Sequence, residues 1–506
     1  PYFREFLRKQ LGDILEKVNA DLDTNYNLYA DGLIIHTTLH GGLQEMAEAS
    51  VKEHMSRLQQ DLERQWRGNP PWTKENELAN MQITQSYPFK KLKRQRLADE
   101  AIFDSLSVPH KTKIFTWQGE VDTVMSSLDS ILYHFGILQC GVFAIDGQTG
   151  EVLTWIGGPN YKYFKYDHVT AARQVGSTIK PLIYATAIEN GLDPCEYFEN
   201  DSLSYPESDD WVPHNADNRF GGYYSVQGAL VNSVNTVSVK VLMETGIEKT
   251  VHSLFEAGIT TPLPKVPSLA LGSAEIPLLQ MVPAYAAFIN EGENPDIRYI
   301  TKIEDRAGNV IYEPPKPEEK TPVFSKETMH IMQVLLKGVT ERGTATSLRS
   351  VWGLPGDFGG KTGTTQKHTD GWFIGITPEI VIGVWIGGDH PVVRFKSLNH
   401  GQGSHTAMPI FARILQRART DRSTAPFVSG AFSIPPETYD RLGCYDFKDE
   451  KGILDFLKKK PEYEDLSGSK IKEKADEDEK EQTKVGKFLR KIFGGKNKDK
   501  KEKDKK

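Results

Sequence analysis

Residues 1–57 alternate between helix-like and strand-like hydrophobic patterns. FREFLRKQLGDILEKV, which begins at Phe3, places apolar residues three and four apart, as an amphipathic helix does. GLIIHTTL, from Gly32, has the β-branched, apolar character of a strand, and GLQEMAEASVKEHMSRL, from Gly42, returns to helical spacing. The pattern therefore predicts a helix–strand–helix unit.

Two hairpin patterns lie far apart in the chain. CGVFAIDGQTGEVLTWIGG, from Cys140, has two apolar runs joined by a turn at Asp146-Gly147. GWFIGITPEIVIGVWIGG, from Gly371, repeats this arrangement with a turn at Thr377-Pro378. Helical patterns dominate residues 177–345 between them. Strands at both ends of a mainly helical body predict an α/β (mixed α+β) domain, with a mixed sheet whose outer strands come from distant sequence.

Polar segments set the boundaries of the expected domains. Residues 58–110 contain RGNPPW and KKLKRQR, and we expect an exposed, partly irregular insertion there. The compact body is expected over 111–420, with a C-terminal extension over 421–460. Residues 461–506 are almost wholly charged and are expected to form a disordered tail.

Length and composition fit a large folded protein. The chain has 506 residues, of which 38% are hydrophobic and 26% charged, enough for two or more domains. Its three cysteines, Cys140, Cys195 and Cys444, are far apart and odd in number, and they indicate neither a disulfide framework nor a zinc site. No apolar run approaches the ~18–20 residues of a membrane span, and no signal peptide is visible. Because the chain begins with Pro1, we expect it to be part of a longer protein.

Charge is distributed unevenly along the chain. The net charge is −6, yet the segment from Lys484 to Lys506 holds eleven lysines or arginines and three acidic side chains. An acidic body argues against nucleic-acid binding by the body, whereas the tail carries a net charge of the opposite, basic sign. Val485, Phe488, Leu489, Ile492 and Phe493 form an apolar stripe in that tail, so a membrane-surface contact is the alternative to a disordered extension.

The candidate chemistry begins in QVGSTIKPLIYATAIENG, where Ser177 and Lys180 stand three positions apart. Pro181 fits the first turn of a helix, and Asn190-Gly191 is a C-terminal stop, so this pair lies at a helix N-terminus. The helix dipole there disfavours an ammonium and favours an alkoxide, which would make the lysine a base and the serine a nucleophile. A second Ser-x-x-Lys, Ser467 and Lys470, lies in the charged tail without a core around it.

Two further motifs follow in order. Ser233-Val-Asn235 lies after the Ser177 helix, at the start of another helical pattern. Lys361-Thr362-Gly363-Thr364 comes later in the chain and leads into the second hairpin. The ordered triple is the signature of serine acyl-transferases that react with penicillin.

The chain resembles the transpeptidase half of a class A penicillin-binding protein. The resemblance extends from PYFREFLRKQLG through RQVGSTIKPLIYATAIENG and GALVNSVNTVSVKV to ERGTATSLRS, over roughly residues 1–56 and 111–415. It implies a penicillin-binding/serine β-lactamase-like fold, with an antiparallel sheet flanked by helices. Residues 1–57 would then be a smaller connector after an absent glycosyltransferase domain. The segment at 58–110 looks like the form found in Bacteroidota.

The resemblance also implies a role for each motif residue. Ser177 would attack the penultimate D-alanine of a peptidoglycan stem peptide, Lys180 would take its proton and Ser233 would relay it. Asn235, Lys361, Thr362, Gly363 and Thr364 would bind substrate, and the backbone N–H groups of Ser177 and Thr364 would form the oxyanion hole. No metal and no cofactor are implied. The thirteen histidines, His214 among them, show no ligand spacing.

The expected partners are stem peptides, a lipid-linked precursor and β-lactams as covalent inhibitors, with an anchor before Pro1 holding the domain at the periplasmic face of the inner membrane. Two alternatives share the fold. A serine β-lactamase needs a deacylating base, in one large class within Glu-x-x-x-Asn, and no Glu from Glu244 to Glu341 has Asn four positions later. A penicillin-sensing receptor domain is not preceded by a connector like that at 1–56.

Overall fold

The structure, a computed structural model, describes residues 1–73, 77–316 and 320–449. The first compact unit covers Pro1–Lys451. The predicted tail, with its apolar stripe, lies outside the described residues. Within these residues, no helix is long and apolar enough to cross a membrane.

The predicted N-terminal unit is confirmed. It comprises α1 (Tyr2–Leu22), β1 (Ile34–Thr37) and α2 (Gly41–Trp66). β1 pairs with β10 (Ile300–Glu304), which pairs with β11 (Val310–Tyr312), so this small sheet is completed by a segment from the other half of the chain. The helical pattern of the sequence did not predict β10 and β11.

The expected irregular insertion is helical. After α2 continues to Trp66, the chain forms α3 (Glu77–Gln85), α4 (Tyr87–Arg94), α5 (Asp99–Ser107), a hairpin of β2 (His110–Thr116) and β3 (Gly119–Met125), and α6 (Ser127–Phe135). A small core joins α3, α4 and α5: Ile83, Phe89, Ile102 and Leu106. Each of α3, α4 and α5 buries only one or two side chains, so the sequence carries little helical periodicity. The prediction of a partly irregular segment missed these helices, although irregular links remain at residues 67–70 and 95–98.

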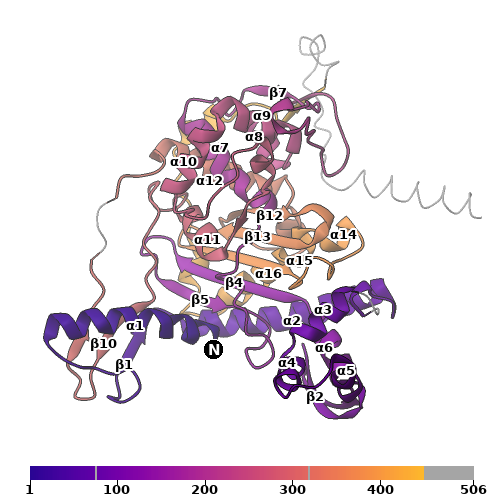
Figure 1. The fold of residues 1–506 in the computed structure, drawn as a ribbon. Coiled ribbons are helices and arrows are strands. Elements are labelled where there is room, and N and C mark those ends of the chain that lie inside the picture. The colour runs from indigo at the N-terminus through magenta and orange to yellow at the C-terminus, as the bar shows by residue number, and fades with distance from the viewer. Residues whose placement is uncertain (74–76, 317–319, 450–506) are drawn as a thin grey trace, which may run out of the picture. The chain divides into compact units, whose positions relative to one another are not determined.

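A five-stranded sheet organises the main body (Figure 1). Its order is β12 (Gly359–Thr364), β13 (Asp370–Ile376), β14 (Ile380–Gly387), β4 (Gln139–Asp146) and β5 (Val152–Ile156). Both predicted hairpins, β4–β5 and β13–β14, are present and lie side by side. Every pairing in this sheet is antiparallel, so the expectation of a mixed sheet was wrong, whereas the antiparallel sheet implied by the resemblance is confirmed.

Successive side chains of the sheet enter two different cores, as the two-residue period of a strand requires. Trp372 and Ile374 join the helices on one face, while Phe373 between them joins the other face. The first face contacts α11 (Leu278–Ala286), and the second contacts α16 (Met408–Ala418) and α2 (Figure 1). The edge strand β12 also packs against α12 (Lys326–Glu341).

The other described helices and short strands complete the body around the sheet. They are β6 (Arg173–Gln174), a 3-10 turn η2 (Gly176–Ile179), α7 (Lys180–Glu189), β7 (Tyr197–Glu199), β8 (Tyr223–Ser225), α8 (Val226–Val231), α9 (Asn235–Thr245), α10 (Ile247–Glu256), β9 (Glu275–Ile276), α13 (Ser347–Ser350), α14 (Leu398–Gly401), α15 (Gly403–Thr406), α17 (Pro426–Ser429), α18 (Pro436–Arg441) and β15 (Phe447–Lys448).

One prediction about cysteines was wrong. Cys195 and Cys444 form a disulfide across a sequence separation of 249, and Cys140 is free and buried. The two cysteines meet because the C-terminal extension returns to the body, where β15 pairs with β8. Nothing in the sequence indicated this return. Spacing along the chain cannot show a contact made by such a return.

Candidate active site

Ser177 lies in η2, directly before α7, so the predicted helix start is confirmed. Its side chain is half-buried. The preceding Gly176 has φ of +54°, and a Cβ there would lie 2.8 Å from the carbonyl oxygen of Thr364. Glycine therefore allows both the left-handed backbone and the close approach of η2 to the end of β12. The turn is held in place by Trp372, whose Nε1 donates to the Gln174 carbonyl at 2.8 Å.

Lys180 is the first residue of α7 and is fully buried. Its Nζ donates to the carbonyl oxygen of Ser233 at 2.9 Å and to Oδ1 of Asn235 at 2.8 Å, and lies 3.4 Å from Oγ of Ser233. The first and second motifs therefore meet at this amine.

Ser233 lies between two lysines. Its Oγ accepts a hydrogen bond from Nζ of Lys361 at 2.9 Å, in addition to its contact with Lys180. Its φ is +58°, a left-handed conformation that is uncommon for serine. Strained backbone of this kind persists where its surroundings fix it, often at functional sites.

The two lysines are buried without a counter-ion among the residues that the structure describes. Burial lowers the pKa of Lys361 to about 7. Burial also moves the pKa of Lys180 well below its usual range, and the nearby charge of Lys361 lowers it further. Low-dielectric surroundings disfavour the ammonium form, so the fold makes Lys180 easier to deprotonate than an exposed lysine.

Asn235 is fixed by the loop before α8. Its backbone N–H donates to Oδ1 of Asn215 at 2.9 Å, and its side-chain Nδ2 donates to the His214 carbonyl at 2.8 Å. Only one of the two amide hydrogens is used by His214, so the second can serve a ligand. His214 acts here through its backbone, and the described residues contain no cluster of His, Cys, Asp and Glu that could hold a metal.

The third motif forms β12, the edge strand of the sheet. A Cβ on Gly363 would lie 2.8 Å from the Val175 carbonyl, so glycine lets β12 pack against the segment that leads to Ser177. The Thr364 hydroxyl accepts from the Gly403 N–H at 3.0 Å, which leaves its own hydrogen free to donate.

Thr344 is a site neighbour that the sequence did not reveal. Its hydroxyl lies 2.9 Å from that of Thr362, so the two share a hydrogen bond. A threonine between two helices carries no sign in the sequence of a contact with a later strand.

The structure thus brings Lys180, Ser233, Asn235 and Lys361 into one hydrogen-bonded group, with the hydroxyls of Thr362 and Thr364 on the adjoining strand edge. The Ser177 hydroxyl has no hydrogen bond to Lys180, nor to any other described residue, and so is left for a ligand. A half-exposed hydroxyl in the turn that leads directly to a buried lysine of lowered pKa is suited to acyl transfer.

Comparison with protein families identifies the family to which the chain belongs. Residues 140–416 match the penicillin binding protein transpeptidase domain, and residues 67–138 match the penicillin-binding protein middle domain. The chain belongs to the penicillin-binding protein family. The transpeptidase match includes all three motifs, and the middle-domain match covers most of the region predicted as an insertion.

Relatives place the chain near the class A members. Penicillin-binding protein 1A of Aquifex aeolicus is 30% identical over 433 residues, which cover 81% of this chain and 56% of the relative. The protein of the same name from Rickettsia felis is 28% identical over 465 residues, covering 82% and 58%. The chain therefore spans somewhat over half the length of these relatives. The resemblance to the transpeptidase half of a class A protein is confirmed, while the Bacteroidota variant stays a prediction.

Solved structures share the fold. The crystal structure of penicillin-binding protein 1A from Haemophilus influenzae aligns with a TM-score of 0.63 at 21% identity, over 86% of this chain and 72% of that one. PonA1 from Mycobacterium tuberculosis, solved in complex with penicillin V, aligns with a TM-score of 0.55 at 17% identity, over 83% and 93%.

Proposed function

We propose that the chain is the serine D,D-transpeptidase part of a peptidoglycan cross-linking enzyme, inhibited by β-lactams. The observation that carries the proposal is the buried Lys180–Ser233–Lys361 hydrogen-bonded group beside the turn that bears Ser177. Membership of the family agrees with it.

In this proposal, neutral Lys180 accepts the hydroxyl proton as Ser177 attacks the carbonyl of the penultimate D-alanine. The C–N bond to the terminal D-alanine then breaks, and Ser233, hydrogen-bonded to Lys361, passes a proton to the leaving amine. An acceptor amine attacks the resulting ester, forms the cross-link and releases Ser177.

Binding of the substrate follows from the remaining motif residues. We assign the oxyanion to the backbone N–H groups of Ser177 and Thr364; the close contact of Gly176, the neighbour of Ser177, with Thr364 supports this assignment. The hydroxyls of Thr362 and Thr364 would hold the terminal carboxylate, near the charge of Lys361, and Asn235 would donate its second amide hydrogen to the substrate backbone.

For the whole protein, we propose further parts beyond this chain. Its connector, residues 1–57, would follow a glycosyltransferase domain and a membrane anchor, and lipid-linked precursor would be a second substrate. The basic tail stays a candidate membrane contact. We place the transpeptidase domain in the periplasm, and the Cys195–Cys444 disulfide supports this location because such bonds persist in oxidising compartments.

A β-lactamase is distinguished by the lifetime of the acyl-enzyme. No Glu from Glu244 to Glu341, the stretch between the second and third motifs, has Asn four positions later, so the sequence offers no base of that β-lactamase class there to activate water. We expect the penicilloyl adduct to persist for minutes or longer, measured by intact mass after removal of free penicillin. Rapid catalytic hydrolysis of a chromogenic cephalosporin would favour the β-lactamase.

A penicillin-sensing receptor domain is distinguished by turnover of a peptide. The proposed enzyme should release D-alanine from a stem-peptide analogue that ends in D-alanyl-D-alanine, and penicillin should block the release. A receptor domain would be acylated by penicillin and yet release no D-alanine.

The pH dependence of acylation tests whether the charge of Lys361 lowers the pKa of Lys180. Lys361→Met removes the positive charge that lowers the pKa of Lys180, so that pKa should rise. Since Lys180 must be neutral to act, the acid limb of the acylation rate should move to higher pH. The midpoints of the two proteins are compared over the full pH range in which both stay folded, and the comparison applies below about pH 7, where Lys361 of the unmodified chain carries its charge.

The control for this experiment is Lys326→Met, which removes an exposed lysine that pairs with Glu291. It should leave the midpoint unchanged. An acid limb that stays in place in Lys361→Met, or moves to lower pH, would show that the two lysines are not coupled in this way.

A further inference from the structure

The described part of the C-terminal extension includes a short segment, Leu442–Lys448, that we name the strap. The strap is joined to the body by the Cys195–Cys444 disulfide and by the pairing of β15 with β8. Gln227 in α8 adds two hydrogen bonds from its Nε2, to the carbonyl oxygens of Cys444 at 2.7 Å and Leu442 at 3.3 Å. The strap therefore packs on the body as an integral element.

The strap supports the helix that leads to Ser233. The carbonyl of Asp446 accepts from the N–H of Ser225, the N-cap of α8, at 3.1 Å. A Cβ on Gly228 would lie 2.1 Å from the same carbonyl oxygen, so only glycine lets α8 approach the strap this closely. Because α8 ends at Val231, just before Ser233, a displacement of the strap would be carried directly to the second motif.

A second connection runs from the strap to the third motif. The Asp446 carboxylate forms a two-point ion pair with Arg342, at 2.8 Å to Nε and 3.2 Å to the terminal nitrogen. Arg342 is the C-cap residue of α12, and Thr344 lies two positions later. The Thr344 N–H donates to the Val231 carbonyl at 3.4 Å, and its hydroxyl bonds that of Thr362.

We propose that the strap is a positioning element of the acylation site, with Asp446 as the residue that sets both Ser233 and Thr362 through α8 and the Arg342–Thr344 segment. The disulfide holds Asp446 in place. The mechanism of acyl transfer does not require this element, because neither Asp446 nor either cysteine touches the reacting groups. The inference rests on the proposed function for its assay.

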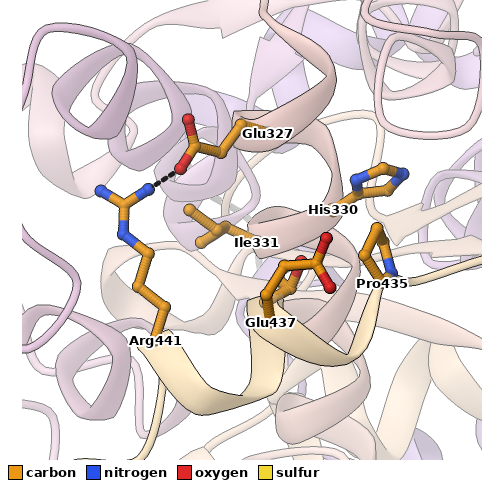
Figure 2. Close-up of a pocket in the computed structure, with 7 residues that line it drawn as sticks. Glu327, His330, Ile331, Pro435, Glu437 and Arg441 are labelled. Carbon is orange, nitrogen blue, oxygen red and sulfur yellow. Dashed lines mark hydrogen bonds and ion pairs between the residues drawn. The ribbon is translucent and has the colours of Figure 1, made fainter.

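The same extension makes a contact that serves as a control. In α18, Arg441 pairs with Glu327 of α12 beside an open pocket of about 390 Å³ that is also lined by His330 and Glu437 (Figure 2). Arg441→Gln therefore breaks one exposed ion pair between the extension and α12 and leaves the Asp446–Arg342 pair in place. Exposed pairs contribute little to stability.

The test compares Asp446→Asn, Asp446→Glu, Cys195→Ser/Cys444→Ser and Arg441→Gln with the unmodified full chain. The first-order acylation rate at saturating penicillin is measured at a temperature where thermal unfolding shows each variant folded. A thiol titration of the denatured chain, expected to find one free thiol before reduction and three after it, verifies the disulfide.

We expect Asp446→Asn and the double serine variant to acylate roughly tenfold more slowly, since small displacements of reacting groups have large effects on rate. Asp446→Glu should recover part of the loss, and Arg441→Gln should match the unmodified chain. Peptide-resolved hydrogen exchange should also rise over residues 226–235 in Asp446→Asn.

Equal acylation rates per folded molecule, with only a lower melting temperature, would assign the strap a purely structural role and overturn the inference. If Asp446→Asn does not fold, Asp446→Glu and the unmodified chain before and after reduction provide the same comparison. An unmodified chain that penicillin does not acylate would instead contradict the proposed function.

Discussion

Ser177→Ala should abolish covalent labelling by a fluorescent penicillin. Ser177 lies half-exposed in the turn before α7, and Lys180, whose pKa burial lowers, is the first residue of that helix. Alanine removes the hydroxyl that forms the ester. Loss of a serine nucleophile lowers rates by about 10⁴-fold or more, so labelling should fall below detection in a gel assay.

The matched control is Ser467→Ala, which removes the serine of the other Ser-x-x-Lys sequence. It should label like the unmodified chain. Circular dichroism and the melting temperature should be close to those of the unmodified chain in both variants, because each loses a single hydroxyl. Labelling that survives Ser177→Ala in a folded protein would remove Ser177 from its assigned role.

Lys180→Arg should have the second largest effect. Burial and the charge of Lys361 lower the pKa of Lys180 so that it can exist as a free amine, whereas a guanidinium stays protonated throughout the working range. General-base catalysis contributes about 10²- to 10⁴-fold, and acylation should slow by that much. The acylation rate is followed by fluorescence at saturating penicillin.

Because Lys180 is fully buried, the larger side chain also requires a check on folding. Lys180→Met, which removes the amine and keeps a flexible apolar side chain, should be as slow as Lys180→Arg. Near-normal acylation by a folded Lys180→Arg protein would move the role of base to Ser233 or Lys361, the two groups that share the hydrogen-bonded network.

The local parts of the site could be predicted from the sequence. Ser177 and Lys180 are three positions apart, and Pro181 with Asn190-Gly191 marks both ends of their helix, which is α7 in the structure. Both hairpins were visible because each places two apolar strands and their turn in one short, continuous stretch. The lowered pKa of Lys180 was also predicted, from its place at a helix N-terminus, and the structure adds its burial and the charge of Lys361 as causes.

What could not be predicted depends on contacts between distant segments. The disulfide closes only when the chain returns to β8, and Thr344 meets Thr362 only because α12 packs on β12. The short helices α3 to α5 bury too few side chains for a periodic pattern. The left-handed conformation of Ser233 is imposed by its surroundings, since the residue itself does not favour it.

The most direct test of the proposed chemistry is to locate the penicillin adduct. The full chain is incubated with penicillin, its intact mass is measured, and the digest is sequenced by tandem mass spectrometry. We predict one penicilloyl group per chain, on the peptide that contains Ser177. An adduct on any other residue, or a chain that penicillin leaves unmodified while folded, would contradict the assignment of Ser177 as the nucleophile.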